Sequence, residues 1–302
     1  MANDAQRDEM IRARAGGLDI LHRPELHPDL VVCAVDLHRG RDALGREACE
    51  KWGPGSSVSR IELEDGGVRF DLAVKWVRWR GLRGALADRC FGSRGARALA
   101  GAKRVAACGI GIPEVLAVAD RRRVGWVVES FLITRFADGA QPLSALLPGL
   151  AGQPRSRRRL AGALGDLVGS LHAAGVDHPD LKHSNLLVGP GGRLTLLDLD
   201  ALVPTRRLNR RRRVRSLALF EAYARDLNPW LPRSDRLRFL HAYFERCPEA
   251  SGERRALLAD VETAVDRKLA NWARRDRAGQ IHYQLVPRER TREGRVTRPG
   301  TT

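Results

Sequence analysis

The sequence predicts an α+β fold with two lobes, a β-rich lobe followed by a mainly helical lobe. Two apolar, alternating segments flank an Asp-Gly turn at residues 65–66, a pattern typical of a β-hairpin. Apolar residues then recur at helical spacing from Leu160 to Leu171 and again between about residues 215 and 273. A chain of 302 residues is long enough for two lobes that each have a core.

The β-rich lobe is expected to span residues 17–136 in the order β-β-α-β-β. Residues 57–63 and 68–79 form the predicted hairpin, and the alternation places Lys75 on the face of its strand opposite Trp76. A helix is expected at residues 93–108, and two strands are expected at 115–119 and 124–133.

The helical lobe is expected to span residues 137–286. Its first helix should end before Gly175, since glycine is a common C-terminal stop. Two short apolar segments, 185–188 and 194–197, surround a glycine-rich stretch and predict a small hairpin. The polar ends of the chain, residues 1–16 and 287–302, are expected to be mobile tails.

Composition indicates a cytosolic protein. The first residues include acidic side chains where a signal peptide has basic ones, and no apolar run approaches the roughly 20 residues that cross a bilayer. The five cysteines are scattered and lack a Cys-x-x-Cys pair, so the sequence favours neither a disulfide framework nor a zinc site.

The chain carries 53 basic and 36 acidic residues, a net charge of +17, which favours an anionic partner. Nucleic acid is the least favoured, because aromatic residues are 5% of the chain and no recognition motif occurs. The densest basic run, residues 206–215, has two readings of equal weight. It is a solvated helix face, or it binds an anionic acceptor or the anionic leaflet of the inner membrane.

The segment His178-Pro-Asp180-Leu-Lys-His-Ser-Asn185, followed by Asp198-Leu-Asp200, carries the strongest chemical signal. Phosphoryl transfer needs a carboxylate that orients the attacking hydroxyl, which Asp180 could supply. It also needs carboxylate or amide oxygens for Mg²⁺, which Asn185 and Asp198 could supply. Polar residues that cap turns would explain each residue alone, but they do not predict the joint spacing.

This segment, with Lys75 upstream, resembles the protein-kinase superfamily, and more specifically the lipopolysaccharide core kinases that act on Kdo and heptose. The features of that family in this chain are Ala73-Val-Lys75, Ser93-Arg94, Gly111-Ile-Pro113, Leu132-Ile-Thr134, the Asp-Leu-Asp motif and Leu237-Arg-Phe-Leu240. The resemblance covers about residues 53–245. It implies a two-lobed protein-kinase-like fold with a β-rich N-lobe and a mainly helical C-lobe.

The resemblance also implies a role for each matching residue. Asp180 is the expected catalytic base, and Lys182 is expected to steady the transferred phosphate. Lys75 is expected to contact the α- and β-phosphates of ATP, while Asn185 and Asp198 are expected to hold Mg²⁺. Gly53 and Gly55 lie in a candidate phosphate loop, and His178 is expected to support the catalytic loop.

The sequence departs from the typical kinase pattern in three places. The helix expected at 93–108 contains no Asp or Glu, so Lys75 must find another carboxylate or act unpaired; Glu114, Glu129 and Asp88 are the nearby candidates. Val58 stands where a third glycine of the phosphate loop is expected. Leucine replaces the phenylalanine of the metal motif.

Together these features predict a kinase that uses ATP and Mg²⁺ and acts on an anionic glycolipid or sugar. The preferred acceptor is a hydroxyl of a lipopolysaccharide inner-core sugar, Kdo or heptose, reached at the cytoplasmic face of the inner membrane. One alternative is a kinase of protein Ser/Thr residues or of another small molecule. The other is a pseudokinase adaptor that binds nucleotide or membrane, which the missing helix glutamate favours and the joint presence of Asp180, Asn185 and Asp198 opposes.

Overall fold

The computed structural model describes residues 10–78, 81–205 and 207–277. The chain forms two compact units. The β-rich unit contains the chain up to Asp138 and also Leu196–Leu202, and the helical unit contains Gly139–Thr195 and the chain from Val203 on. The segment 196–202 therefore returns to the β-rich unit after the chain has begun the helical one. The division lies two residues beyond the boundary expected from the sequence, 136/137.

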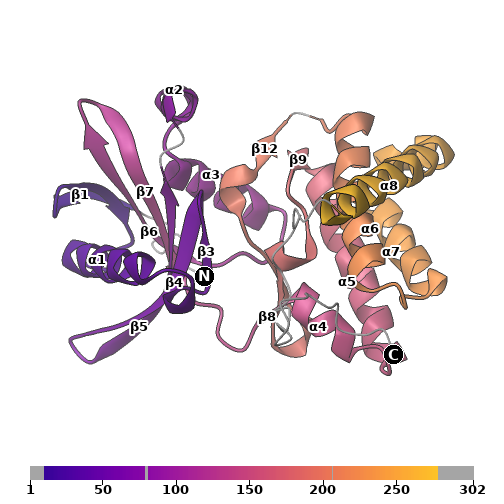
Figure 1. Cartoon of the computed structure of the whole chain (residues 1–302), viewed down its shortest axis with the longest axis horizontal. Helices are drawn as coiled ribbons and strands as arrows, with labels where there is room; N and C mark the ends of the chain where they lie inside the picture. The colour runs from indigo at the N-terminus through magenta and orange to yellow at the C-terminus, as the bar shows by residue number, and fades with distance from the viewer. Residues whose placement is uncertain (1–9, 79–80, 206, 278–302) are drawn as a thin grey trace, which may run out of the picture. The chain divides into compact units, whose positions relative to one another are not determined.

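A seven-stranded antiparallel sheet forms the β-rich unit, with strand order β1-β2-β6-β7-β5-β4-β3 (Figure 1). Its strands are β1 (Ile11–Ala15), β2 (Leu18–His22), β3 (Lys51–Gly53), β4 (Ser56–Asp65), β5 (Val68–Arg78), β6 (Val115–Arg123) and β7 (Trp126–Arg135). Strand β1 occupies part of the expected tail 1–16, so that expectation was wrong for residues 11–15. The expected tail 287–302 lies outside the described residues.

The predicted hairpin is confirmed as β4 and β5. Asp65 pairs with Val68, and the two turn residues, Gly66 and Gly67, both have positive φ, at 55° and 79°. Positive φ at both central residues is the requirement of a type I′ turn, and glycine meets it without steric cost. The turn fixes the register of β5, which sets the face on which Lys75 lies.

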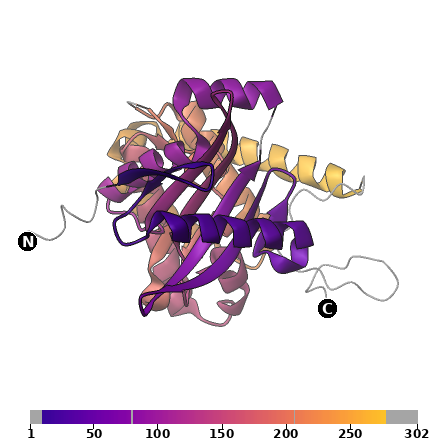
Figure 2. The same ribbon diagram turned by 90° about the vertical axis from the view of Figure 1, so that its left-hand side faces the viewer.

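Helix α1 (Pro28–Leu44), followed by a short 3₁₀ turn at Arg46–Ala48, covers one face of the sheet (Figure 2). Val31, Ala34 and Val35 of this helix are fully buried against strand residues such as Leu72 and Val74. The sequence analysis did not identify α1. Its signal was the helical spacing of these apolar residues after Pro28, which suits the first turn of a helix.

Helices α2 (Gly81–Phe91) and α3 (Arg94–Ala107) complete the β-rich unit. The helix expected at 93–108 is confirmed as α3, and the Ser93 hydroxyl caps it by accepting a hydrogen bond from the Ala96 N–H at 3.2 Å. At Gly95 an added Cβ would lie 2.5 Å from a methyl carbon of Val118. Glycine therefore allows α3 to lie close to β6, on the sheet face opposite α1.

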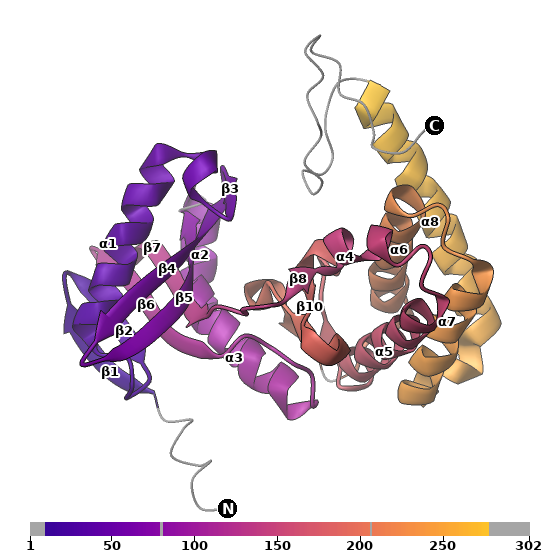
Figure 3. The same ribbon diagram turned by 90° about the horizontal axis from the view of Figure 1, so that it is seen from below.

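The helical unit contains mainly α-helices (Figure 3). The helices are α4 (Leu143–Gly149), α5 (Pro154–Ala173), α6 (Arg210–Leu227), α7 (Arg233–Arg246) and α8 (Arg254–Arg277); 3₁₀ turns lie at His183–Asn185, Pro190–Gly192 and Pro248–Glu253. Short strands are β8 (Gln141–Pro142), β9 (Val176–Asp177), β10 (Leu186–Val188), β11 (Leu194–Leu196) and β12 (Val203–Pro204). The pairing of β10 with β11 confirms the predicted small hairpin. In the described ranges, no helix combines the length and apolarity that crossing a membrane requires.

Candidate functional site

The candidate site of the β-rich unit is a charge cluster centred on Lys75. Period-two alternation places Lys75 opposite the α1-covered face, and its side chain is 19% exposed. Its ammonium group donates hydrogen bonds to Asp198 and, at 2.6 Å, to Asp200. Lys75 and the Asp-Leu-Asp motif, far apart in the sequence, therefore meet within one unit.

Arg94, at the start of α3, extends this cluster. Its guanidinium donates a hydrogen bond at 2.9 Å to the carboxylate oxygen of Asp200 that does not bind Lys75. The Asp200 side chain is 5% exposed and thus lies buried between two cations. Sequence reasoning included Asp200 in the metal motif but did not name it or Arg94 as a site residue. The repeated aspartate of the motif was the available signal.

The backbone at Asp198 has left-handed dihedral angles, φ 64° and ψ 44°. Few non-glycine residues adopt this conformation, although aspartate tolerates it better than most, and such residues concentrate at functional sites. The left-handed residue starts a 3₁₀ turn, Leu199–Ala201, that packs against α3.

Both charged forms are stabilised within the cluster. Burial alone would raise the pKa of Asp198, but the charge and hydrogen bond of Lys75 hold that pKa well below its ordinary value. Burial alone would lower the pKa of Lys75, but Asp198 and Asp200 raise it above its ordinary value. Lys75 is therefore a cation, and Asp198 is an anion, at neutral pH.

The three carboxylates considered as partners of Lys75 pair with arginines instead. Glu114 contacts Arg23 and Arg135, Glu129 contacts Arg39 and Arg121, and Asp88 contacts Arg97. Those candidates were wrong, because the sequence does not show which part of the chain returns to this sheet face. Ala98, near the expected place of the missing glutamate, is buried on α3.

The candidate phosphate loop is the turn between β3 and β4. Gly53 pairs with Ser56 across this turn, and Gly55 accepts a hydrogen bond from the Arg78 N–H at 3.2 Å. The turn belongs to the hairpin immediately before the strand of Lys75. The Gly53 carbonyl also accepts a hydrogen bond from the Arg78 guanidinium, and an added Cβ at Gly53 would lie 3.8 Å from its nearest atom, the Ser56 backbone oxygen.

The candidate site of the helical unit is the loop around Asp180. The Asp180 carboxylate, with its side chain 41% exposed, lies 2.7 Å from the Lys182 ammonium. The Asn185 amide nitrogen donates to the main-chain oxygen of Asp180 at 2.8 Å and to its carboxylate at 3.2 Å. Because the nitrogen is directed at Asp180, the amide oxygen of Asn185 is the atom left to act as a ligand.

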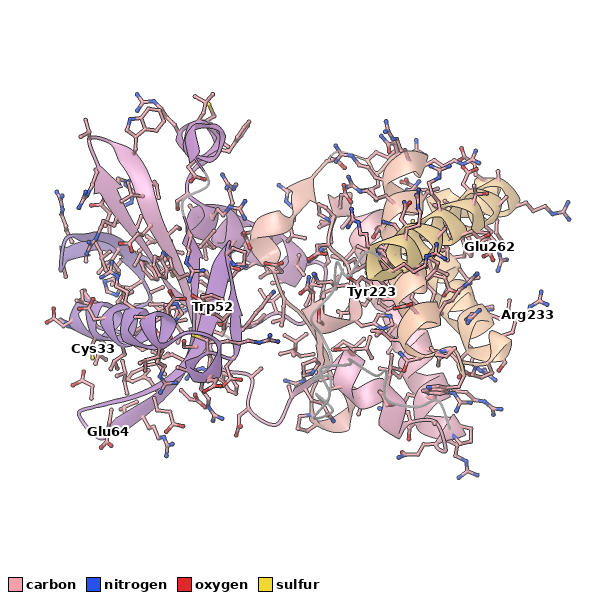
Figure 4. The ribbon with its side chains drawn as sticks, in the orientation of Figure 1. Cys33, Trp52, Glu64, Tyr223, Arg233 and Glu262 are labelled. Atoms are coloured by element: carbon pink, nitrogen blue, oxygen red, sulfur yellow. The ribbon has the colours of Figure 1, made fainter. Side chains whose placement is uncertain are left out.

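Buried aromatic and imidazole rings support this loop. His183 packs on Phe220, with ring centroids 4.7 Å apart, and burial lowers its pKa to about 4, so that it is neutral. Tyr223, labelled in Figure 4, lies on α6 near Asp180, and burial together with that carboxylate raises its pKa to about 12. His178 is 1% exposed, as a residue supporting the loop would be.

The basic run at 206–215 lies mainly at the start of α6, where most of its arginines form ion pairs. Asp177, whose side chain is 1% exposed, binds Arg215 and lies 3.6 Å from Arg212. Other pairs are Arg207 and Arg213 with Glu249, and Arg210 with Asp260. Cations at a helix N-terminus oppose the helix dipole, and these carboxylates offset that cost. The pairs support the structural reading of the run; Arg206 lies outside the described residues.

The helical unit also contains a cavity of about 550 Å³, whose lining includes His183 and Phe220. Its walls are mainly apolar side chains of five helices, α4 to α8, with charged residues such as Arg233 and Glu262 among its lining (Figure 4). The apolar lining includes Leu160, Leu164, Leu217, Phe220, Phe239, Leu240, Leu258 and Val261. This size lies in the range of pockets that enclose small ligands.

Mg²⁺ prefers carboxylate, carbonyl and phosphate oxygens, and each unit has residues that suit it. In the β-rich unit these are the carboxylate oxygens of Asp198, beside the positive charge of Lys75. In the helical unit it is the amide oxygen of Asn185. Throughout the part of the chain that the structure describes, no three His, Cys, Asp or Glu side chains form a metal-binding cluster.

Comparison with known proteins finds a curated relative and a solved structure with the same name. The lipopolysaccharide core heptose(I) kinase WaaP of Pseudomonas aeruginosa is 32% identical over 136 residues, which are 42% of this chain and 49% of that protein. The chain thus spans about half the length of this curated relative. The solved structure of WaaP in complex with acyl carrier protein covers 76% of this chain and 92% of its own, with a TM-score of 0.54 at 23% identity.

The structural likeness confirms the predicted kinase-like α+β fold. The family described as lipopolysaccharide kinase (Kdo/WaaP) matches residues 91–243, which make up just over half of the chain. That range includes Arg94, the loop of Asp180 and the Asp198-Leu-Asp200 motif. The chain therefore belongs to the lipopolysaccharide kinase (Kdo/WaaP) family.

Proposed function

We propose that this protein is an ATP-dependent kinase that phosphorylates a hydroxyl group of a lipopolysaccharide inner-core sugar, Kdo or heptose. The observation that carries the proposal is the direct pairing of Lys75 with Asp198 in the β-rich unit. In kinases a strand lysine binds the phosphates and the aspartate of the metal motif holds Mg²⁺, and this pairing brings two such residues together. Family membership supports the lipopolysaccharide acceptor.

Each residue then has a defined role. Lys75 binds the α- and β-phosphates, and the turn with Gly53 and Gly55 lies over them. Asp180 orients the acceptor hydroxyl and accepts its proton as the new oxygen–phosphorus bond forms and the bond to the β-phosphate breaks. Lys182 steadies the transferred phosphoryl group. Mg²⁺ held by Asp198 and Asn185 would neutralise phosphate charge.

The acceptor would be an anionic glycolipid at the cytoplasmic face of the inner membrane. The net charge of +17 favours such a substrate by long-range attraction. Because most arginines of the 206–215 run pair within the helical unit, they contribute to this attraction as part of the overall charge rather than as free ligands.

Transfer of labelled phosphate from ATP to extracted core glycolipid, with Mg²⁺ present, tests the proposal. Asp180→Asn should reduce transfer by about 10²-fold or more, since it removes the base but keeps the shape of the side chain. The matched control is Asp166→Asn, which removes a carboxylate of similar exposure, in the same unit, that pairs with Arg246. Equal loss in both variants would contradict the assigned role.

The same assay separates the alternatives. If labelled phosphate appears in protein or in a small sugar and not in glycolipid, the protein is instead a kinase of that acceptor. Nucleotide binding without transfer to any of these acceptors would favour the pseudokinase adaptor.

As a second function, we propose that the helical unit binds an acyl carrier protein. The solved relative was obtained in complex with such a protein, and the 550 Å³ cavity of this chain is walled by apolar side chains suited to an acyl chain. Leu164→Trp should fill the cavity and weaken binding of an acylated carrier protein, with little effect on the unacylated form. Leu44→Trp, at a position 79% exposed in the β-rich unit, is the control. Equal affinity of the Leu164 variant and the unaltered protein for the acylated form would refute the assignment of this cavity.

A further inference from the structure

The proposed function assigns no role to the carboxylate of Asp200. It is 5% exposed and binds two cations at once, Lys75 at 2.6 Å through one oxygen and Arg94 at 2.9 Å through the other. A buried carboxylate is costly unless its charge is matched and its oxygens are hydrogen-bonded, and here both conditions hold. The two contacts fix the carboxylate in one orientation.

Lys75 has two carboxylate partners, and they differ in their expected duties. Asp198 is the proposed ligand of a metal ion, so its oxygens are needed elsewhere when nucleotide is bound. If Asp198 were the one partner, Lys75 would compete with the metal for it. Asp200 offers Lys75 a carboxylate that Arg94 already holds in place.

The packing of α3 explains why this carboxylate comes from residue 200. At Gly101 of α3, an added Cβ would lie 2.8 Å from the backbone oxygen of Leu199. The helix thus approaches the backbone of segment 198–202 directly, and α3 contains no acidic residue. The acidic group reaches Lys75 from that segment, while α3 contributes Arg94.

We propose that Asp200, held by Arg94, is a positioning residue that orients Lys75 and leaves Asp198 free for the metal-bound phosphates. It performs the task for which a typical kinase uses a glutamate on the helix that corresponds to α3. This inference rests on the proposed function, because it assumes that Lys75 binds nucleotide phosphates. Asp200 and Arg94 thus together replace the missing helix glutamate, and each can be substituted.

Affinity for a fluorescent ATP analogue in the presence of Mg²⁺ tests the inference without requiring an acceptor. Asp200→Asn should weaken binding by between about 10-fold and 100-fold, because Lys75 loses its orientation. Asp200→Glu should restore part of the loss. The half-saturating Mg²⁺ concentration should rise in Asp200→Asn, because Lys75 then competes for Asp198. Glu129→Gln is the matched control, since Glu129 is also a largely buried partner of arginines in the same unit, with its side chain 18% exposed.

A double-mutant cycle with Lys75→Met separates positioning from other roles. If Asp200 acts through Lys75, adding Asp200→Asn to Lys75→Met should cause little further loss of affinity. A further loss as large as that in the single variant would overturn the inference and indicate that Asp200 binds the metal or the nucleotide directly.

Two other results would also overturn the inference. One is a Mg²⁺ dependence identical to that of the unaltered protein in Asp200→Asn. The other is loss of affinity in Glu129→Gln equal to that in Asp200→Asn, which would mean that general destabilisation causes the effect. Failure of the unaltered protein to bind nucleotide would instead refute the proposed function itself.

Discussion

Replacement of Gly101 by alanine is the sharpest test of how α3 positions the charge cluster. Gly101 lies inside α3, where alanine normally stabilises a helix by about 1 kcal/mol relative to glycine. The new Cβ would lie 2.8 Å from the Leu199 backbone oxygen and 2.9 Å from a methyl carbon of Leu202. A side chain can rotate away, but the backbone oxygen can move only if segment 198–202 moves.

The expected magnitude follows from these two opposing effects. Overpacking of a close contact costs about 1–3 kcal/mol, which exceeds the helix gain over most of that range. Gly101→Ala should therefore lower the free energy of unfolding by up to about 2 kcal/mol, as measured by urea unfolding. Hydrogen exchange should increase at residues 198–202, and nucleotide affinity should fall because Asp198 and Asp200 shift.

Gly162→Ala is the control, because Gly162 lies in α5 with no heavy atom within 4 Å of an added Cβ. It should stabilise the protein by about 1 kcal/mol. If Gly101→Ala stabilises the protein as much as this control and leaves nucleotide affinity unchanged, the argument from close packing is refuted.

Three further outcomes concern the helical unit. Gly165→Ala should destabilise it by about 1–3 kcal/mol in urea unfolding, because an added Cβ would lie 2.2 Å from the backbone oxygen of Phe239. His183→Leu should flatten the dependence of the free energy of unfolding on pH. The His183 ring takes up a proton near pH 6.5 in the unfolded chain, but burial lowers its pKa to about 4 in the folded protein. Between pH 7 and pH 5 the unaltered protein should therefore lose about 2 kcal/mol more of its free energy of unfolding than the variant. Asp235→Asn should cost about 3–5 kcal/mol, since it leaves Arg157 of a buried ion pair without its charge partner.

Each of these has a control at a more open position. Gly162→Ala is expected to stabilise α5 rather than disrupt it, so equal effects at both glycines would contradict the packing argument. Substitution of His241, which is 71% exposed, should leave the pH dependence unchanged; a similar flattening would show that burial is not its cause. Asp166→Asn, in an exposed ion pair, should lower the free energy of unfolding by about 1 kcal/mol or less. If it lowers that free energy as much as Asp235→Asn does, burial is not the cause of the larger effect.

Local sequence determined the elements of the site. The two-glycine turn at 66–67 fixed the β4–β5 hairpin, and period-two alternation then placed Lys75 on its face. Ser93 marked the start of α3 through its capping hydroxyl. These features depend on residues close in the chain, so a pattern in one sequence is enough to predict them. Helix α1 was missed although its spacing was also local.

The roles within the catalytic motif came from spacing and from resemblance. Spacing and resemblance together identified Asp180, Asn185 and Asp198 as site residues. In the structure, Asn185 donates hydrogen bonds directly to Asp180. The basic run looked equally suited to binding an anion and to a solvated face. Its pairing with Asp177, Glu249 and Asp260 became visible when distant segments were brought together.

The sequence by itself thus determined the fold class, the family resemblance and the residue types available for phosphate chemistry. The tertiary structure decided which carboxylates meet Lys75. The three carboxylates first considered pair with arginines, while Asp198 and Asp200 reach Lys75 from more than a hundred residues away. Sequence patterns report on the neighbours of a residue along the chain. Charge pairing depends on which backbone segments can approach closely, and here that depends on the absence of a side chain at Gly101.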